Sequence, residues 1–88
     1  MSIKERAMYK NKAEHGRHNL CGQRIKAIRE SLPEKTSQRK LADMLQMAGL
    51  DLDKNAIQRI ESGKRFVTDI ELKVIAKVLK VSYQDLLD

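Results

Sequence analysis

The sequence predicts an all-α protein, folded as a compact bundle of five short helices. Only 3% of the residues are aromatic, so the core must be aliphatic, and the abundant Leu, Ile, Ala, Lys, Arg, Glu and Gln favour helix. Apolar residues recur at helical spacing in successive segments, whereas no segment alternates as a strand does. Residues typical of helix ends separate these segments.

Length and charge limit the organisation and the partners of the chain. Its 88 residues allow one domain, and 41% hydrophobic residues are enough for a core. A net charge of +6 indicates an anionic partner, either nucleic acid or an anionic membrane surface. The single cysteine, Cys21, cannot form an internal disulfide, which is typical of a reducing compartment. With neither a membrane-span pattern nor a secretory signal, the sequence predicts a cytoplasmic protein.

Residues 1–19 differ from the rest of the chain. They are rich in Lys and Arg and contain few apolar residues at helical spacing. We expect a flexible, basic N-terminal arm there, followed by one domain over residues 20–88. Such an arm can reach into a groove or along phosphates, or can stay solvated as a tail.

The first two helices are predicted by apolar stripes and by their ends. The first stripe ends at Pro33, because the residue before a proline avoids the helical conformation. Ser37 is a suitable N-cap for the second helix, and Gly49 a suitable helix-ending residue. The stripes consist of Cys21, Ile25, Ile28 and Leu32 in the first helix, and of Leu41, Ala42, Met44, Leu45 and Ala48 in the second.

The last three helices have equally clear ends. Asp53 suits an N-cap and Gly63 an end for the third helix. Thr68 and Glu71 have the spacing of a capping box before the fourth helix, and Ser82 suits the N-cap of the fifth. The inward residues are expected to be Ile57 and Ile60, then Leu72, Ile75, Ala76 and Leu79, and finally Leu86 and Leu87.

Four pieces of sequence follow one another in a recognisable order: Ser37-Gln38, Leu41-Ala42, Ile57-x-x-Ile60-Glu61-x-Gly63-Lys64-Arg65 and Leu72-x-x-Ile75-Ala76-x-x-Leu79-x-Val81-Ser82. Together they resemble the Cro/C1-type (XRE-like, lambda-repressor-like) helix-turn-helix family. The resemblance covers roughly residues 20–88, and implies the five-helix lambda-repressor-like bundle and DNA binding. The stretch between Leu45 and Ile57 is about five residues longer than in the compact motif, so we expect a longer second helix and a looser turn.

The third helix, about residues 54–62, is the candidate recognition helix. With Ile57 inward, steps of 100° per residue place polar side chains on the outer face. The major groove admits such a helix, where arginine can bind guanine and asparagine can bind adenine in bidentate fashion. The resemblance implies base contacts for Lys54, Asn55 and Arg59, with Gln58 as a further candidate.

The same resemblance implies phosphate contacts and one structural ion pair. Gln38 matches a position at a helix N-terminus, which favours an anion. Arg29 and Glu61 match positions that form a partly buried pair joining the first and third helices. The phosphate candidates are Gln38, Arg39, Lys40, Ser62, Lys64 and Arg65.

Other interpretations remain open at this point. The polar face of the third helix can be an ordinary solvated surface, and the cations of the following loop can serve the helix C-terminus. His15, His18 and Cys21 have a spacing that can hold zinc, but structural zinc sites usually need four ligands, so we predict no metal. Met44 and Met47 are expected to fill the core.

Two function classes follow. The first is a sequence-specific DNA-binding transcriptional regulator, either a repressor or a regulator of a phage-like or mobile element, which binds double-stranded DNA and assembles on it as a weak homodimer. The second is a protein-interaction module such as an antitoxin or adaptor, with an exposed apolar patch at Met47, Leu50 and Leu52. We predict no enzyme, cofactor or small-molecule ligand, because no nucleophile is paired with a base and no glycine loop can cradle phosphate.

Overall fold

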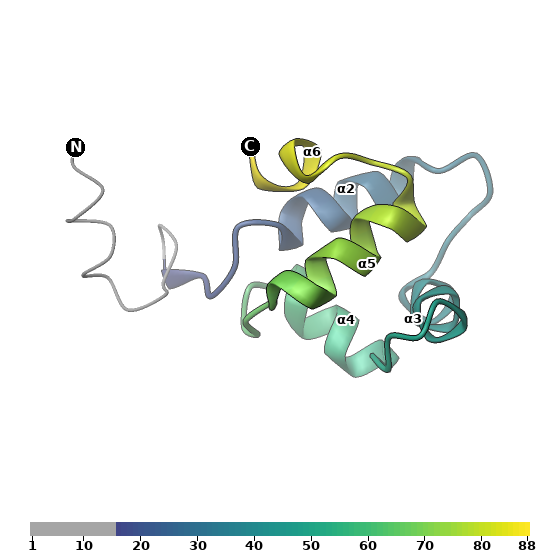
Figure 1. Ribbon diagram of the computed structural model, residues 1–88, viewed down its shortest axis with the longest axis horizontal. Coiled ribbons are helices and arrows are strands. Elements are labelled where there is room, and N and C mark those ends of the chain that lie inside the picture. Colours follow the sequence, from purple (N-terminus) through teal and green to yellow (C-terminus); the bar gives the residue numbers. More distant parts are fainter. Residues whose placement is uncertain (1–15) are drawn as a thin grey trace.

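The computed structural model describes residues 16–88, which form an all-helical domain with no strand in this range (Figure 1). In Figure 1, α5 crosses the front, α2 and α6 lie above it, and α4 and α3 lie below it. Helix α2 packs against α4 and α6, and α3 packs against α4 and α5. The helices are α2 (Gly22–Ser31), α3 (Gln38–Met47), α4 (Lys54–Glu61), α5 (Asp69–Leu79) and α6 (Tyr83–Leu87). No helix in residues 16–88 is long and apolar enough to cross a membrane.

The N-caps of α3 to α6, and the ends of α2, α3 and α4, are those that the sequence predicts. The side chains of Ser37, Asp53, Thr68 and Ser82 each accept a hydrogen bond from the backbone amide three residues on. Thr68 and Glu71 form the expected reciprocal capping box. Leu32, directly before the proline, is extended, and Gly49 and Gly63 have positive φ angles of 94° and 81°. These ends depend only on neighbouring residues, which is why the sequence predicts them well.

The core is aliphatic, as expected from the scarcity of aromatic residues. Burying this apolar surface is the main favourable contribution to folding. Partly buried side chains, among them Ile28, Leu72 and Val78, surround the centre. Its fully buried members are Cys21, Ile25, Leu41, Ala42, Leu45, Leu52, Ile57, Ile60, Ile75, Ala76, Leu79 and Leu86.

Three expectations about apolar side chains are wrong. Ala48 is exposed rather than part of the buried stripe of α3, because it lies at the C-cap, beyond the last buried turn. Met47 is 90% exposed rather than a filler of the core, because it lies on the last turn of α3 beyond its buried stripe. Leu87 is 41% exposed, whereas Leu86 is buried, because a helix as short as α6 turns only one of two adjacent residues inward. Helix α3 extends through Met47, and residues 48–53 connect it to α4.

The segment before α2 packs against the domain. Arg17, His18 and Asn19, which the sequence analysis assigns to the arm, all form hydrogen bonds to residues 60–65. The side chain of Asn19 is buried. The remainder of the expected arm, residues 1–15, lies outside the described residues.

Candidate nucleic-acid interface

Helix α4 has one buried side and one exposed side. Its start is fixed by Asp53, whose carboxylate oxygen accepts a hydrogen bond from the Ala56 amide at 2.8 Å. Ile57 and Ile60 are 1% and 0% exposed, and hold the helix against the core. Because these two residues point inward, the opposite side of α4 is presented to solvent.

The four candidate base-contact residues lie on that exposed side. Lys54, Asn55, Gln58 and Arg59 are all exposed. None of their side chains forms a hydrogen bond or ion pair to another residue within 16–88. No residue among 16–88 occupies the donors and acceptors of these four side chains, so they are available to a partner molecule.

Beneath the exposed side, Glu61 connects three elements. Its carboxylate accepts from Arg29 Nε at 2.8 Å and Arg29 Nη2 at 2.9 Å, and from Gln38 Nε2 at 2.9 Å. Arg29 also donates to the Thr36 carbonyl oxygen at 2.9 Å. The pair expected between Arg29 and Glu61 is therefore in place and is bidentate. The hydrogen bonds that Arg29 donates to Glu61 raise the pKa of its guanidinium.

The hydrogen bond from Gln38 to Glu61 bears on the phosphate contact predicted for Gln38. Gln38 opens α3, but its side-chain amide points to the buried carboxylate and not to solvent. Its backbone amide lies at the N-terminus of α3, a position that favours an anion. Gln38 and Glu61 are 23 residues apart, so neither helical periodicity nor a local end signal in the sequence predicts their contact.

Arg65 is held in a similar way. Its guanidinium makes two 3.0 Å hydrogen bonds to the Glu71 carboxylate, and one to the Phe66 carbonyl oxygen. These bonds lower the pKa of Glu71, chiefly through the hydrogen bond from Arg65, and raise that of Arg65. Arg65 thus closes the connection between α4 and α5, and a phosphate has to compete with Glu71 for it.

The remaining phosphate candidates are more accessible. Arg39, Lys40, Ser62 and Lys64 are exposed. Lys40 makes a long, exposed ion pair of 3.4 Å with Glu34, which contributes little to stability. Lys64 and Arg39 form no ion pair to a residue in the described range.

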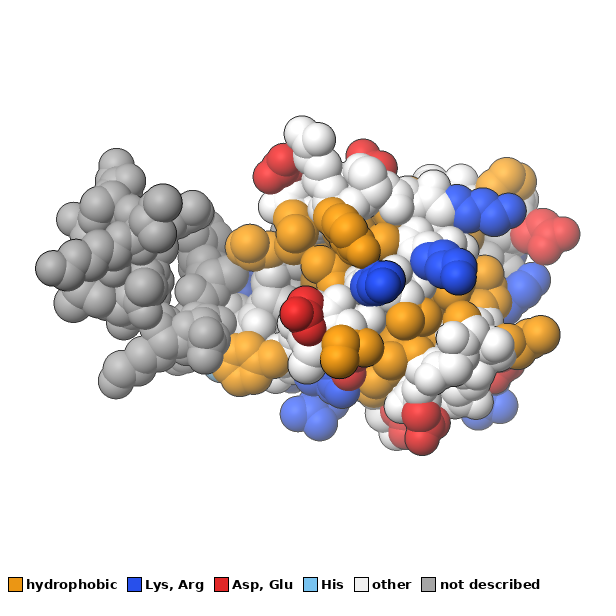
Figure 2. All heavy atoms as spheres, in the orientation of Figure 1, with side chains coloured by type: hydrophobic (Ala, Val, Ile, Leu, Met, Phe, Trp, Pro, Cys, Tyr) orange, Lys and Arg blue, Asp and Glu red, His pale blue; other side chains and the backbone are white. Residues whose placement is uncertain are grey.

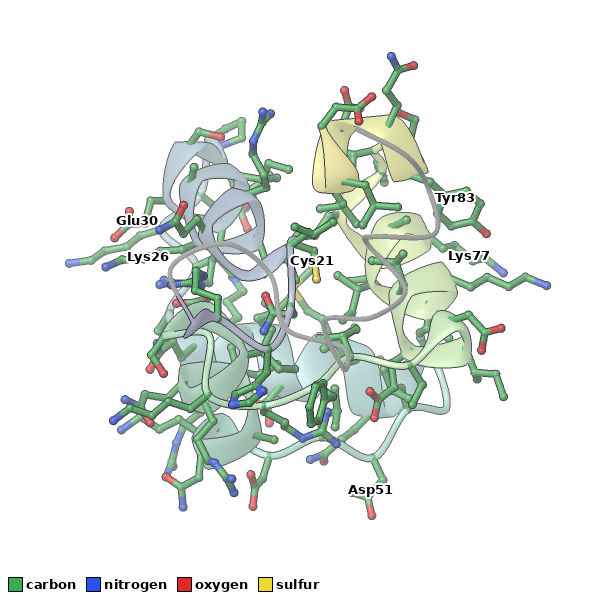
Figure 3. All side chains as sticks on the ribbon, turned by 90° about the vertical axis from the view of Figure 1, so that its left-hand side faces the viewer. Cys21, Lys26, Glu30, Asp51, Lys77 and Tyr83 are labelled. Atoms are coloured by element: carbon green, nitrogen blue, oxygen red, sulfur yellow. The ribbon has the colours of Figure 1, made fainter. Side chains whose placement is uncertain are left out.

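The possible zinc ligands do not form a site in the described residues. His15 lies outside them, and no group of three potential ligands occurs within residues 16–88. Cys21 points into the interior between α2 and α5 (Figure 3), and burial raises the pKa of its thiol to about 11. A thiol held neutral in this way is a poor metal ligand, because metals bind the thiolate.

The apolar patch that the interaction-module interpretation requires is not formed. Leu52 is 4% exposed and belongs to the core, and Leu50 packs against it, leaving only Met47 at the surface. Exposed apolar side chains gather instead on the face that carries α5 (Figure 2), where Ile70, Leu72, Tyr83 and Leu87 line a shallow groove.

Comparison with known protein families agrees with this arrangement of helices. The model of the helix-turn-helix family matches residues 25–86. The chain belongs to the Cro/C1-type helix-turn-helix family. Searches of curated proteins and of solved structures find no match to it. As a member of this helix-turn-helix family, the protein is a DNA-binding regulator, with α3 and α4 as the paired helices of the motif.

Proposed function

We propose that this helix-turn-helix protein is a sequence-specific transcriptional repressor that inserts α4 into the major groove of double-stranded DNA. One observation carries the proposal. Ile57 and Ile60 are buried, while the polar side chains on the opposite side of α4 are exposed and have no hydrogen-bond or ion-pair partner within residues 16–88. An arginine and an asparagine on such a face supply the two most specific bidentate base contacts.

Each polar residue of α4 has a distinct role in the proposal. Arg59 binds guanine O6 and N7, and Asn55 binds adenine N6 and N7. Lys54 and Gln58 add contacts from the first and second turns. Around them, the backbone amide of Gln38 and the side chains of Arg39, Lys40, Ser62 and Lys64 contact phosphates, which set the register without reading the sequence.

Selection of bound sites from a random DNA pool, followed by binding assays on the selected site, tests this function. We expect a sequence motif, and an affinity that falls steeply with salt because each neutralised phosphate releases counterions. Arg59→Ala should weaken binding about 10- to 100-fold and relax the preference at one base position.

Lys26→Ala is the matched control, because Lys26 is also an exposed cation but lies on the outer side of α2 (Figure 3). It should bind as the wild type does. Binding without sequence preference, or wild-type affinity in both Arg59→Ala and Asn55→Ala, would overturn the proposal.

The proposal includes a second copy of the chain. DNA-reading domains of this kind bind two half-sites one helical turn apart, which requires two heads. The groove lined by Ile70, Tyr83 and Leu87 shares no residue with the candidate DNA contacts. Asp69 and Lys73, on its rim, carry opposite charges one helical turn apart. A two-fold axis there places each charge beside the opposite one of the partner.

Cross-linking through an introduced cysteine tests this surface. Ile70 is 71% exposed, and the native Cys21 is buried, so in Ile70→Cys the new thiol is the accessible one. A short bismaleimide should link Ile70→Cys into dimers on the selected DNA, and leave Met47→Cys monomeric. Equal linking of both variants, or a single DNA-bound copy on every selected site, would exclude this face as the interface.

A further inference from the structure

A short segment ahead of α2 ties the N-terminus of the domain to the end of the recognition helix. We call residues 17–19 the latch. His18 donates its backbone amide to the Gly63 carbonyl oxygen at 2.8 Å, and its ring packs edge-on against Phe66 with centroids 4.6 Å apart. The family match begins only at residue 25, so the latch lies outside it.

Asn19 is the centre of the latch. Its side chain is buried, and its Nδ2 donates to two carbonyl oxygens, that of Ile60 at 3.0 Å and that of Arg65 at 2.8 Å. Its Oδ1 accepts from the Gly22 amide at 2.7 Å, in the first turn of α2. The side-chain amide of Asn19 thus forms hydrogen bonds to the first turn of α2, to the last turn of α4 and to the loop that follows α4.

Arg17 covers the same helix end. Its Nη2 donates to the Glu61 carbonyl oxygen at 2.9 Å, where a cation is favoured by the helix dipole. A Cβ on Gly63 would lie 2.6 Å from Arg17 Cζ, so the guanidinium passes directly over this glycine. A Cβ on Gly22 would lie 2.0 Å from the Ile60 carbonyl oxygen, so the ends of α2 and α4 are in backbone contact.

We infer that Arg17 and Asn19 are positioning residues for DNA reading: they fix the C-terminal end of α4 and the loop of residues 62–66. The inference rests on the proposed function. Bidentate base contacts require a defined pose of α4, whereas non-specific contacts to phosphates tolerate a displaced one. The latch therefore acts on the ratio of specific to non-specific affinity.

Two variants separate the halves of the latch. Asn19→Asp keeps an oxygen for the Gly22 amide, but replaces both donors to the Ile60 and Arg65 carbonyl oxygens by an acceptor. Arg17→Met keeps the length of the side chain and removes its donors, whereas Arg17→Lys retains a cation and a donor. Ser82→Ala is the control for stability, because it removes the cap of α6 and leaves the latch intact.

The ratio of affinities for the selected site and for random DNA should fall about 10-fold in Asn19→Asp and Arg17→Met, measured at a temperature at which each variant is folded. Arg17→Lys should stay within about 2-fold of the wild type, and Ser82→Ala should leave the ratio unchanged. If the latch variants keep the wild-type ratio, or Ser82→Ala lowers it as much, the inference is wrong. A wild type without sequence preference would instead refute the proposed function.

Amide hydrogen exchange in the free protein gives a readout that does not depend on DNA. Residues 62–66 should exchange faster in Asn19→Asp than in Ser82→Ala at matched stability, because only the first loses the bonds that hold this loop. Equal exchange in the two variants would show that the latch does not fix the loop, whatever the outcome on DNA.

Discussion

Glu61 is buried beneath the surface that we propose reads DNA, and its charge is neutralised by Arg29 on the opposite helix. The two side chains are 3% and 10% exposed, so neither is hydrated enough to be stable without the other. Gln38 donates a hydrogen bond to the same carboxylate, so Glu61 joins the end of α2, the start of α3 and the end of α4. The family resemblance predicts the ion pair between Arg29 and Glu61, but not the hydrogen bond from Gln38.

Arg29→Ala should lower the free energy of unfolding by about 3–5 kcal/mol, because it leaves a buried carboxylate unpaired. In an 88-residue domain this is a large part of the total stability. Urea denaturation of Arg29→Ala beside the exposed Lys26→Ala checks it. A loss of less than about 1 kcal/mol would show that the pair is exposed to water in solution.

Glu71 predicts a dependence of stability on pH. The hydrogen bonds from Arg65 hold the pKa of this carboxyl below its ordinary value of 4.5, so the folded protein favours the charged form. The unfolded state binds the proton first as the pH falls. The stabilisation is therefore complete above about pH 4.5 and is lost as the pH falls through the folded-state pKa.

Glu71→Gln should accordingly cost about 1 kcal/mol at pH 7, and the difference from the wild type should shrink toward pH 3. Thermal unfolding of both proteins between pH 3 and pH 7 measures it. A gap that stays constant over this range would contradict the assignment.

Among the elements, α5 ends in an unusual way. Lys80 adopts the left-handed conformation, with φ 59° and ψ 44°, and its amide donates to the Ala76 and Lys77 carbonyl oxygens. Gly49 and Gly63 hold comparable positions after α3 and α4, where glycine has no Cβ to clash. The sequence therefore marks the ends of α3 and α4, but not the end of α5.

Lys80→Gly should stabilise the protein by about 0.5–1 kcal/mol, because glycine adopts this conformation without strain. Gly49→Ala should destabilise it by a similar amount, since space around Gly49 is open and only its φ of 94° opposes a side chain. Chemical denaturation of the two variants checks the opposite signs. A loss of stability in Lys80→Gly would mean that the lysine side chain contributes more than its backbone costs.

At the scale of the whole molecule, the distribution of charge matters more than its total. The net charge of +6 indicates an anionic partner, but the fold decides which cations can reach one. Lys64 is exposed, whereas its neighbour Arg65 is bound to Glu71. Two adjacent cations in one motif therefore differ in how accessible they are to a partner.

Lys64→Ala should lower the slope of log affinity against log salt by about one unit, without changing thermal stability. Arg65→Ala should mainly reduce the stability, because it opens the bridge between the loop and α5. Binding titrations at several salt concentrations, combined with thermal unfolding, separate the two effects. The opposite assignment would follow if Arg65→Ala changed the slope and left the melting temperature intact.

The sequence alone determines the helices, their caps and the inward isoleucines of α4, because helical periodicity and end signals act between residues a few positions apart. It places Met47 in the core incorrectly, and it offers Leu52 for an exposed patch although Leu52 is buried, because the burial of a side chain at or beyond a helix end depends on what packs over it. Only the tertiary structure decides that Gln38 and Arg65 are occupied within the domain, and that Arg17 and Asn19 bind the end of α4. These contacts join residues 6 to 46 positions apart, and hydrogen bonds to distant carbonyl oxygens leave no period in the sequence.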